Sequence, residues 1–198
     1  MLELLYPVEQ LAPILPEISS EMVDKARFEP GAEIFPIIQE DGMVIGRAER
    51  SYCHSGSRLL HPVVHLHLID RRERVYLQKR SMTKKLLPGK WDTAVGGHVM
   101  YGERIIDALY REASEELGLD GFNPIFIKCY RWDTAVDAEF VNVFAIVGDI
   151  RPCPDHNEVE EGRWWPISEI ESNYSKGIFT PNFEDEFRDI KDNLLALL

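Results

Sequence analysis

Cysteine is scarce in this 198-residue sequence, and its N-terminal stretch has no apolar run long enough to cross a membrane. The three cysteines, Cys53, Cys129 and Cys153, are too few and too irregular to form a disulfide framework. The N-terminal stretch also lacks a basic segment, and acids and prolines interrupt it, which excludes a signal peptide. We therefore expect a cytoplasmic protein that has no membrane partner.

Basic residues are also in short supply. Lysine and arginine together number 22, against 34 aspartates and glutamates, so the formal net charge is −12. Binding to a nucleic-acid backbone needs many lysine and arginine contacts with phosphate, so nucleic acid is not expected as a partner. A small phosphorylated substrate is still compatible with this charge, because a bound metal ion reverses the local sign.

The length and composition of the chain predict one main domain with an N-terminal extension. A hydrophobic content of 44% over this length is enough for a sizeable core. We expect the extension over residues 1–57, with helical pieces to about residue 30 that prolines interrupt. A β-hairpin should follow, with its turn at Asp41-Gly42. The main domain should then cover residues 58–190.

Alternating and β-branched patterns predict the strands of this domain. We expect strands over 62–69, 75–80, 91–95, 124–132 and 138–150, followed by a polar, acidic loop over 151–162. A short strand should end at Pro166, and a helix should begin at Ile167. The last helix, from about residue 182, should bury one face, made of Phe183, Phe187, Ile190 and Leu194. This order predicts an α/β fold with a mixed sheet between helices.

The most informative stretch runs from residue 97 to residue 119. A glycine loop leads into a helix with an apolar stripe, and Gly118 is placed where a left-handed residue ends a helix. We expect that stripe at Ile106, Leu109, Ala113 and Leu117. Three carboxylates beside it repel one another unless cations lie among them. The fixed positions are Gly97, Glu103, Arg111, Glu112, Glu115, Glu116, Gly118 and Leu119.

The spacing of these residues resembles the Nudix box, and every fixed position of that motif matches. The resemblance implies an α/β/α sandwich and a hydrolase that cleaves diphosphate linkages with Mg²⁺ or Mn²⁺. It implies that Glu112, Glu115 and Glu116 bind the metal with help from the Gly97 carbonyl. It also implies that Arg111 pairs with Glu103, although Asp107, four residues before Arg111, is a rival partner.

The reaction also needs a general base and cations that hold the substrate phosphates. Glu115 is one candidate base, and the loop acids Glu158, Glu160 and Glu161 are others, although such charge runs are more often solvated. Arg80, Lys84 and Lys85 precede the motif by one loop. We expect Arg80 and Lys84 to bind a terminal phosphate, with ordinary surface charge as the alternative.

A second resemblance lies inside the first. The order of several segments resembles isopentenyl-diphosphate isomerase and the isomerase-like Nudix hydrolases. These segments are a pair of histidines, then KRSMTKK and PGKW, then GGHV and finally DAE. It implies a second metal ion, for which imidazole and carboxylate ligands favour Zn²⁺ or Mn²⁺. The implied ligands are His54, His61, His98, Asp137 and Glu139, which we expect to converge. The isomerase needs a cysteine where this chain has Gly96, which favours the hydrolase.

Three functions are therefore weighed. The first is a Nudix hydrolase acting on a small nucleotide- or organo-diphosphate. The second is an isopentenyl-diphosphate isomerase-like enzyme, and the third is a non-catalytic Nudix domain that senses a nucleotide or sugar diphosphate. The intact carboxylates favour catalysis over binding alone. The sequence leaves the substrate and the oligomeric state open, with a homodimer as the common case in the family.

Overall fold

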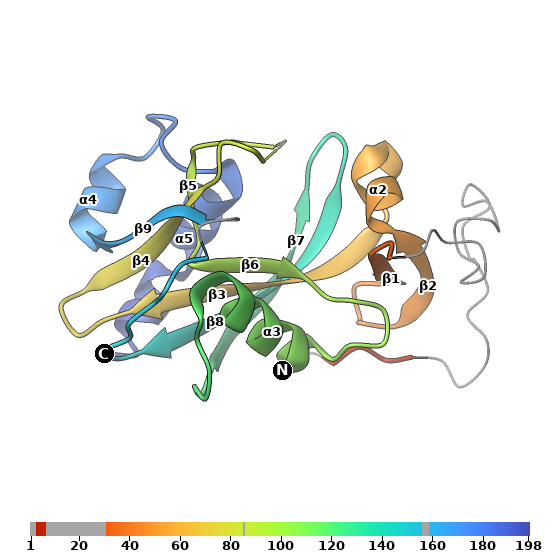
Figure 1. Cartoon of the computed structure of the whole chain (residues 1–198), viewed down its shortest axis with the longest axis horizontal. Helices are drawn as coiled ribbons and strands as arrows, with labels where there is room; N and C mark the ends of the chain where they lie inside the picture. Colours follow the sequence, from red (N-terminus) through yellow and green to blue (C-terminus); the bar gives the residue numbers. More distant parts are fainter. Residues whose placement is uncertain (1–2, 7–30, 85, 156–158) are drawn as a thin grey trace. The chain divides into compact units, whose positions relative to one another are not determined.

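The computed structural model describes residues 3–6, 31–84, 86–155 and 159–198 (Figure 1). The helical pieces expected over residues 1–30 therefore lie almost entirely outside the described residues. The strands are β1 (Ile34–Ile38), β2 (Val44–Glu49), β3 (Leu60–Ile69), β4 (Arg74–Arg80), β5 (Trp91–Asp92), β6 (Val95–His98), β7 (Ile125–Asp133), β8 (Ala138–Val147) and β9 (Val159–Pro166). The helices are α2 (Arg50–Tyr52), the π-helical turn η2 (Cys53–Ser57), α3 (Ile105–Leu117), α4 (Ile167–Ser172) and α5 (Pro181–Leu195).

The expected α/β fold with a mixed sheet is confirmed. Strands β1 and β2 form a two-stranded sheet, and a seven-stranded sheet has the order β5-β4-β3-β8-β7, with β6 paired to β3 and β9 paired to β4. The chain divides into two compact units. The first comprises Met1–Val64, Gly97–Ala108 and Cys129–Asn142, and the second comprises His65–Gly96, Leu109–Lys128 and Val143–Leu198.

The first unit contains the predicted hairpin. Strands β1 and β2 pair antiparallel and lead into α2 (Figure 1). Gly42 adopts a φ of +86° in the turn, and the Asp41 side chain accepts a hydrogen bond from the amide of Met43 at 2.9 Å. Glycine suits such a left-handed position because it has no β-carbon to clash. Two apolar clusters support this unit: Phe35, Ile37, Ala48, Cys53 and Leu59 in one, and Ile38, Val44, Leu60, Ala138 and Phe140 in the other.

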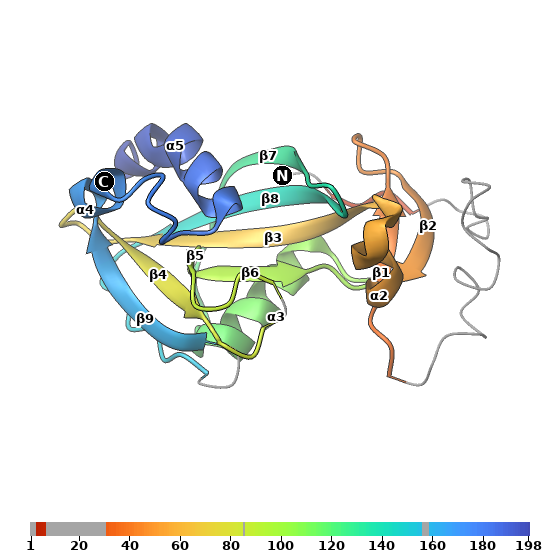
Figure 2. The ribbon, with the colours of Figure 1, turned by 90° about the horizontal axis from the view of Figure 1, so that it is seen from above.

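The second unit is built on the antiparallel pair of β4 and β9, which Figure 2 shows side by side. Gly162 lies opposite Gln78 in this pair, and an added β-carbon would lie 1.9 Å from the oxygen of the nearby Tyr76 side chain. Thr180 caps α5 by accepting a hydrogen bond from the amide of Phe183, and Pro181 follows at the first helical position. The predicted apolar face of α5 is confirmed, since its four members are buried.

Two predictions of local structure were wrong. The acidic loop expected to residue 162 ends earlier, because β9 begins at Val159, and Glu161 pairs in register with Lys79. The single strand expected over 91–95 is two strands, β5 and β6. In both places, pairing with a distant strand decides the structure, and the side-chain pattern alone carries little information about it.

The apolar stripe of α3 also differs at its first turn. Ile105 is 2% exposed and Ala108 is fully buried, whereas Ile106, which was expected in the stripe, is only partly buried. Leu109, Ala113 and Leu117 are buried as predicted.

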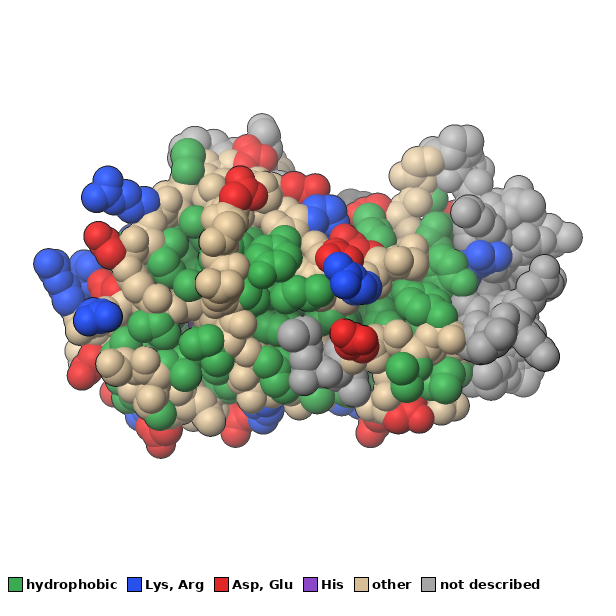
Figure 3. Space-filling model, turned by 90° about the horizontal axis from the view of Figure 1, so that it is seen from below, with side chains coloured by type: hydrophobic (Ala, Val, Ile, Leu, Met, Phe, Trp, Pro, Cys, Tyr) green, Lys and Arg blue, Asp and Glu red, His purple; other side chains and the backbone are tan. Residues whose placement is uncertain are grey.

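None of the helices in these described ranges is long and apolar enough to cross a membrane. Figure 3 shows acidic and basic side chains interspersed with apolar ones on one face of the molecule.

The end of α3 gives a testable prediction. Gly118 has a φ of +59°, and the amide of Leu119 donates to the carbonyl of Ala113 at 3.1 Å, which closes the helix. An alanine β-carbon at residue 118 would meet Cys153 at an ordinary 3.6 Å, so only the backbone conformation is strained. We expect Gly118→Ala to lower the free energy of unfolding by about 1 kcal/mol, measured by urea denaturation.

The exposed Ser114 on the same helix supplies the control, since Ser114→Ala is expected to leave the stability unchanged or slightly higher. Equal stability of Gly118→Ala and the wild type would contradict the assigned helix end.

Candidate functional site

Five residues that are distant in sequence come together in the first unit. His54 lies in η2, His61 in β3, His98 at the end of β6, Asp137 just before β8 and Glu139 within β8. One ligand atom from each of His54, His61 and His98 lies within 4.8 Å of the others, and the same is true of His61, Asp137 and Glu139. The convergence expected from the sequence is therefore confirmed, whereas metal binding by these residues stays a prediction.

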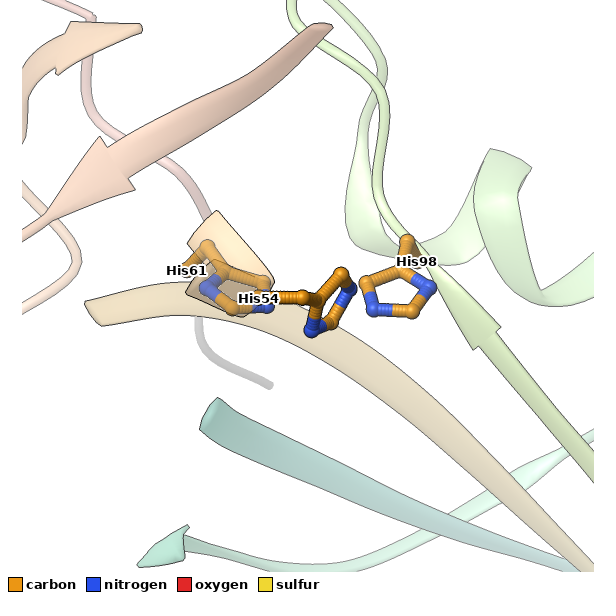
Figure 4. A group of neighbouring side chains, drawn as sticks. All are labelled: His54, His61 and His98. Carbon is orange, nitrogen blue, oxygen red and sulfur yellow. The ribbon is translucent and has the colours of Figure 1, made fainter. Parts of the chain in front are cut away.

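The three histidine rings lie close together (Figure 4), with His61 stacked on His98 and His54 edge-on to both. The ring centroids of His54 and His98 are 5.0 Å apart, and those of His61 and His98 are 5.5 Å apart and nearly parallel. Phe35 of β1 stacks on His98 at 4.5 Å and on His61 at 5.3 Å. Stacking on Phe35 restricts the rotation of the His61 and His98 rings and so holds their nitrogens in place.

Hydrogen bonds select the tautomers of two of these histidines. Nδ1 of His61 donates to the carbonyl oxygen of Leu59 at 2.8 Å, and Nδ1 of His54 is hydrogen-bonded to Oδ2 of Asp137. In each ring the Nε2 atom then carries the lone pair. Both Nε2 atoms are buried and have no hydrogen-bond partner among the described residues.

Burial lowers the pKa of His61 below its ordinary value, although the Leu59 carbonyl and Asp137 partly oppose this effect. The ring is therefore neutral at pH 7, which is the form that binds metal. Burial likewise raises the pKa of the neighbouring Cys53 to about 12, so its thiol stays protonated and is a poor metal ligand.

Asp137 contacts two histidines of the cluster. Asp137 orients His54 through Oδ2, while its Oδ1 lies 3.8 Å from Nε2 of His61. Thr134 holds the loop, because its hydroxyl accepts a hydrogen bond from the amide of Asp137 at 2.9 Å. A carboxylate that orients a histidine ligand is a common feature of metal sites. The clustered imidazole nitrogens and the neighbouring acids fit a borderline divalent ion such as Zn²⁺ or Mn²⁺.

The acids of the 97–119 motif lie on α3 in the second unit. Glu116 is 7% exposed and accepts a hydrogen bond from Nε2 of Gln78 at 3.0 Å. The Glu112 side chain is 15% exposed, whereas that of Glu115 is 61% exposed. Glu112 and Glu116 thus form the inward pair at i and i+4, and Glu115 is the more solvent-accessible acid.

A cation lies among these acids, as the charge repulsion on the helix requires. Nη1 of Arg111 donates to Glu112 at 2.7 Å and to Glu115 at 3.3 Å. Within the described ranges, the three helix carboxylates do not form a group with ligand atoms within 4.8 Å of one another. A shared metal ion would therefore require side-chain rotation on α3.

The loop before α3 belongs to the first unit. Glu103 closes this loop, since its carboxylate accepts a hydrogen bond from the amide of Met100 at 2.9 Å. The rival partner, Asp107, accepts two hydrogen bonds from Arg104, each at 2.6 Å. Asp107 is therefore already engaged within its own helical turn. Gly97 is a buried residue of β6.

The basic loop residues have structural roles of their own. Arg80 pairs with Asp92 at 3.2 Å and donates to the carbonyl oxygen of Leu86, which fixes the loop after β4. The amide of Lys84 donates to Ser81 in the same loop. Of the loop acids, Glu160 and Glu161 lie on β9, and their carboxylate oxygens are 3.8 and 4.0 Å from Nζ of Lys79. The acid Glu158 and the basic residue Lys85 lie outside the described residues.

Sequence reasoning missed two residues of the site. Phe35 stacks on His98 of the histidine cluster, and Gln78 donates a hydrogen bond to Glu116. A phenylalanine in a strand gives no signal of such a role, because core positions favour the same residue. Gln78 carried a weak signal, since it is a polar residue within the apolar run of β4.

Comparisons with known proteins bear on both groups of residues. A family model described as NUDIX domain matches residues 59–187. An uncharacterized Nudix hydrolase of Nostoc sp. is 31% identical over 73% of this chain and 87% of its own length. The isopentenyl-diphosphate Delta-isomerase of Mycolicibacterium vanbaalenii is 33% identical over 68% of this chain and 78% of its own length.

A solved structure agrees with the fold. The crystal structure of DR0079 from Deinococcus radiodurans matches with a TM-score of 0.69, over 79% of this chain and 98% of that chain. At 23% identity this likeness concerns the fold alone.

The histidine cluster predicts metal binding that can be measured directly. We expect the chelator-treated protein to bind one Zn²⁺ or Mn²⁺ through these residues, detected by calorimetry and by a rise in melting temperature. His61→Asn should weaken the affinity at least about tenfold, because a ligand nitrogen is lost from a buried site.

His67→Asn is the matched control and should leave the metal affinity unchanged, because His67 is a buried histidine of the same strand outside the cluster. Equal metal affinity of the wild type and the His61 variant would contradict the assignment.

Proposed function

The chain belongs to the Nudix family, and on that premise we propose that it is a divalent-metal-dependent hydrolase of a small nucleotide- or organo-diphosphate. The observation that carries the proposal is the complete motif over residues 97–119, with Glu112 and Glu116 of α3 directed inward and Arg111 in contact with the acids. A diphosphate repels a nucleophile, and a bound Mg²⁺ or Mn²⁺ supplies charge neutralisation and lowers the pKa of water.

Within this proposal, the residues have separate roles. Glu112 and Glu116 hold the metal with the Gly97 carbonyl, and Glu115, as the exposed member, completes the ligand set or accepts a proton from water. Glu103 and Arg111 fix the loop and the helix. Arg80 and Lys84 bind the terminal phosphate of the substrate, with Arg80 retaining its contact to Asp92.

The relatives include both Nudix hydrolases and isopentenyl-diphosphate isomerases. We favour the hydrolase because the motif acids are complete and because Gly96 has no side chain to transfer a proton. The histidine cluster is then an auxiliary metal site for Zn²⁺ or Mn²⁺. Its resemblance to the isomerase, together with the isomerases among the relatives, supports the second candidate.

A panel assay tests the proposal. Phosphate release, coupled to a phosphatase where needed, would be measured with nucleoside-diphosphate sugars, dinucleotides, coenzyme A and prenyl diphosphates, each with Mg²⁺ or Mn²⁺. Hydrolysis of at least one compound supports the proposal, isomerisation of a prenyl diphosphate supports the second candidate, and binding without turnover supports a sensor.

The motif acids give the next prediction. Glu116→Gln should reduce turnover by orders of magnitude at saturating metal, since a ligand carboxylate is lost. The melting temperature of the metal-free variant should stay the same or rise, because repulsion from Glu112 is relieved. Glu40→Gln, at an exposed acid of the first unit, is the control that should retain full activity. Turnover of Glu116→Gln above about a tenth of wild type would refute the assignment, because a tenth corresponds to only about 1.4 kcal/mol.

The partner of Arg111 can be tested in the same assay. Glu103→Gln should lower kcat/KM more than about tenfold, because the loop loses a charged anchor. Asp107→Asn should change it less than about threefold, since that carboxylate serves Arg104 at the surface. Equal and mild effects of the two substitutions would show that the family role of Glu103 does not transfer to this chain.

A further inference from the structure

Gln78 joins strand β4 to the acids of α3 within the second unit. Its side chain is 7% exposed, and its Nε2 donates a hydrogen bond to Oε2 of Glu116 at 3.0 Å. The amide nitrogen must face the carboxylate, because an ionised carboxylate only accepts hydrogen bonds. The two side chains are 38 positions apart in the sequence, so this contact comes from the packing of the helix on the sheet and not from helical spacing.

The strands on either side of β4 restrict where Gln78 can point. Gly162 of β9 and Asp92 of β5 lie opposite it in register. A β-carbon built on Gly162 would lie 1.9 Å from the Tyr76 hydroxyl oxygen, so the tyrosine already fills the space over the glycine. Asp92 is engaged in hydrogen bonds of its own. Gln78 therefore holds Glu116 from a fixed point on the sheet.

The acids of α3 have two kinds of hydrogen-bonding partner. Glu112 and Glu115 contact the guanidinium of Arg111, which carries a full positive charge. The contact from Gln78 to Glu116 supplies a hydrogen-bond donor and no charge. This contact therefore orients the carboxylate and does not neutralise it.

A neutral residue at position 78 stands out because the other polar positions of β4 are basic. Arg74, Lys79 and Arg80 lie on the same strand. A cation at position 78 would form a charge-assisted hydrogen bond with Glu116, and it would compete directly with a divalent ion for that carboxylate. The amide of Gln78 gives the orientation without this competition.

Hydrogen bonds that orient a ligand carboxylate contribute to the metal affinity of a site, and Mg²⁺ binds ionised carboxylate oxygens in a strict geometry. We propose that Gln78 is the positioning residue of Glu116, and that its neutral amide sets the affinity of the α3 acids for Mg²⁺ or Mn²⁺. This inference rests on the proposed function, which assigns Glu112 and Glu116 to the metal.

Mg²⁺ binding to the chelator-treated full chain tests this role without turnover. The His61→Asn background reduces binding at the histidine cluster, and calorimetry together with the metal-dependent rise in melting temperature reports the affinity. Gln78→Met has nearly the same size as the wild-type residue but no donor, and it should weaken Mg²⁺ binding about tenfold or more. An affinity equal to that of the background protein would overturn the proposal.

A charged variant tests why the residue is neutral. Gln78→Lys adds a cation beside Glu116, so Mg²⁺ binding should weaken about 100-fold while the metal-free melting temperature stays the same or rises. Gln39→Lys makes the same charge change at an exposed glutamine of the first unit, and it should alter the affinity less than about threefold. A loss in Gln78→Lys no larger than that in Gln78→Met would overturn the role of the neutral amide. Gln78→Met adds no charge to the core, so it still tests the positioning role if Gln78→Lys does not fold.

The metal dependence of turnover gives an independent readout with the substrate that the panel identifies. In Gln78→Met, the Mg²⁺ concentration for half-maximal activity should rise about tenfold, and kcat at saturating Mg²⁺ should stay within about threefold of wild type. A lower kcat with an unchanged Mg²⁺ dependence would overturn the positioning role, because it would indicate a general structural effect.

Glu116→Gln separates this inference from the proposed function on which it rests. If Glu116→Gln loses Mg²⁺ affinity and Gln78→Met keeps it, only the role of Gln78 is overturned. If Glu116→Gln binds Mg²⁺ as tightly as the background protein, the metal assignment of the proposed function fails, and the role of Gln78 fails with it.

Discussion

Burying an ionisable side chain requires a partner that replaces water, and three buried histidines place this constraint on strand β3. A buried polar group left without a partner costs about 1–3 kcal/mol. His61 meets the requirement with the Leu59 carbonyl, and His65 and His67 meet it with Glu186. In each case one ring nitrogen is used for structure, which determines the protonation of the other.

Charge repulsion on α3 is the second constraint. Three glutamates within five residues destabilise an isolated helix, and Arg111 compensates by contacting Glu112 and Glu115. Glu116 is stabilised differently, through the amide of Gln78. In the proposed function, a bound divalent ion would neutralise the same acids more completely.

Similarity to relatives alone leaves two activities open, because hydrolases and isomerases match this chain at about equal identity. The decision between them rests on single residues. The complete acid set on α3 favours hydrolysis, and Gly96 removes the side chain that the isomerase resemblance requires.

The sequence by itself determined the features that depend on near neighbours. The helix with its acids, its end at Gly118, the Asp41-Gly42 turn and the apolar face of α5 all follow from spacing within a few residues. The convergence of His54 with Asp137 was anticipated only through family resemblance. The start of β9, the stacking of Phe35 on His98 and the meeting of His65 with Glu186, 121 residues later, were decided by tertiary structure. Such contacts join distant segments, and no local periodicity encodes which segments will pair.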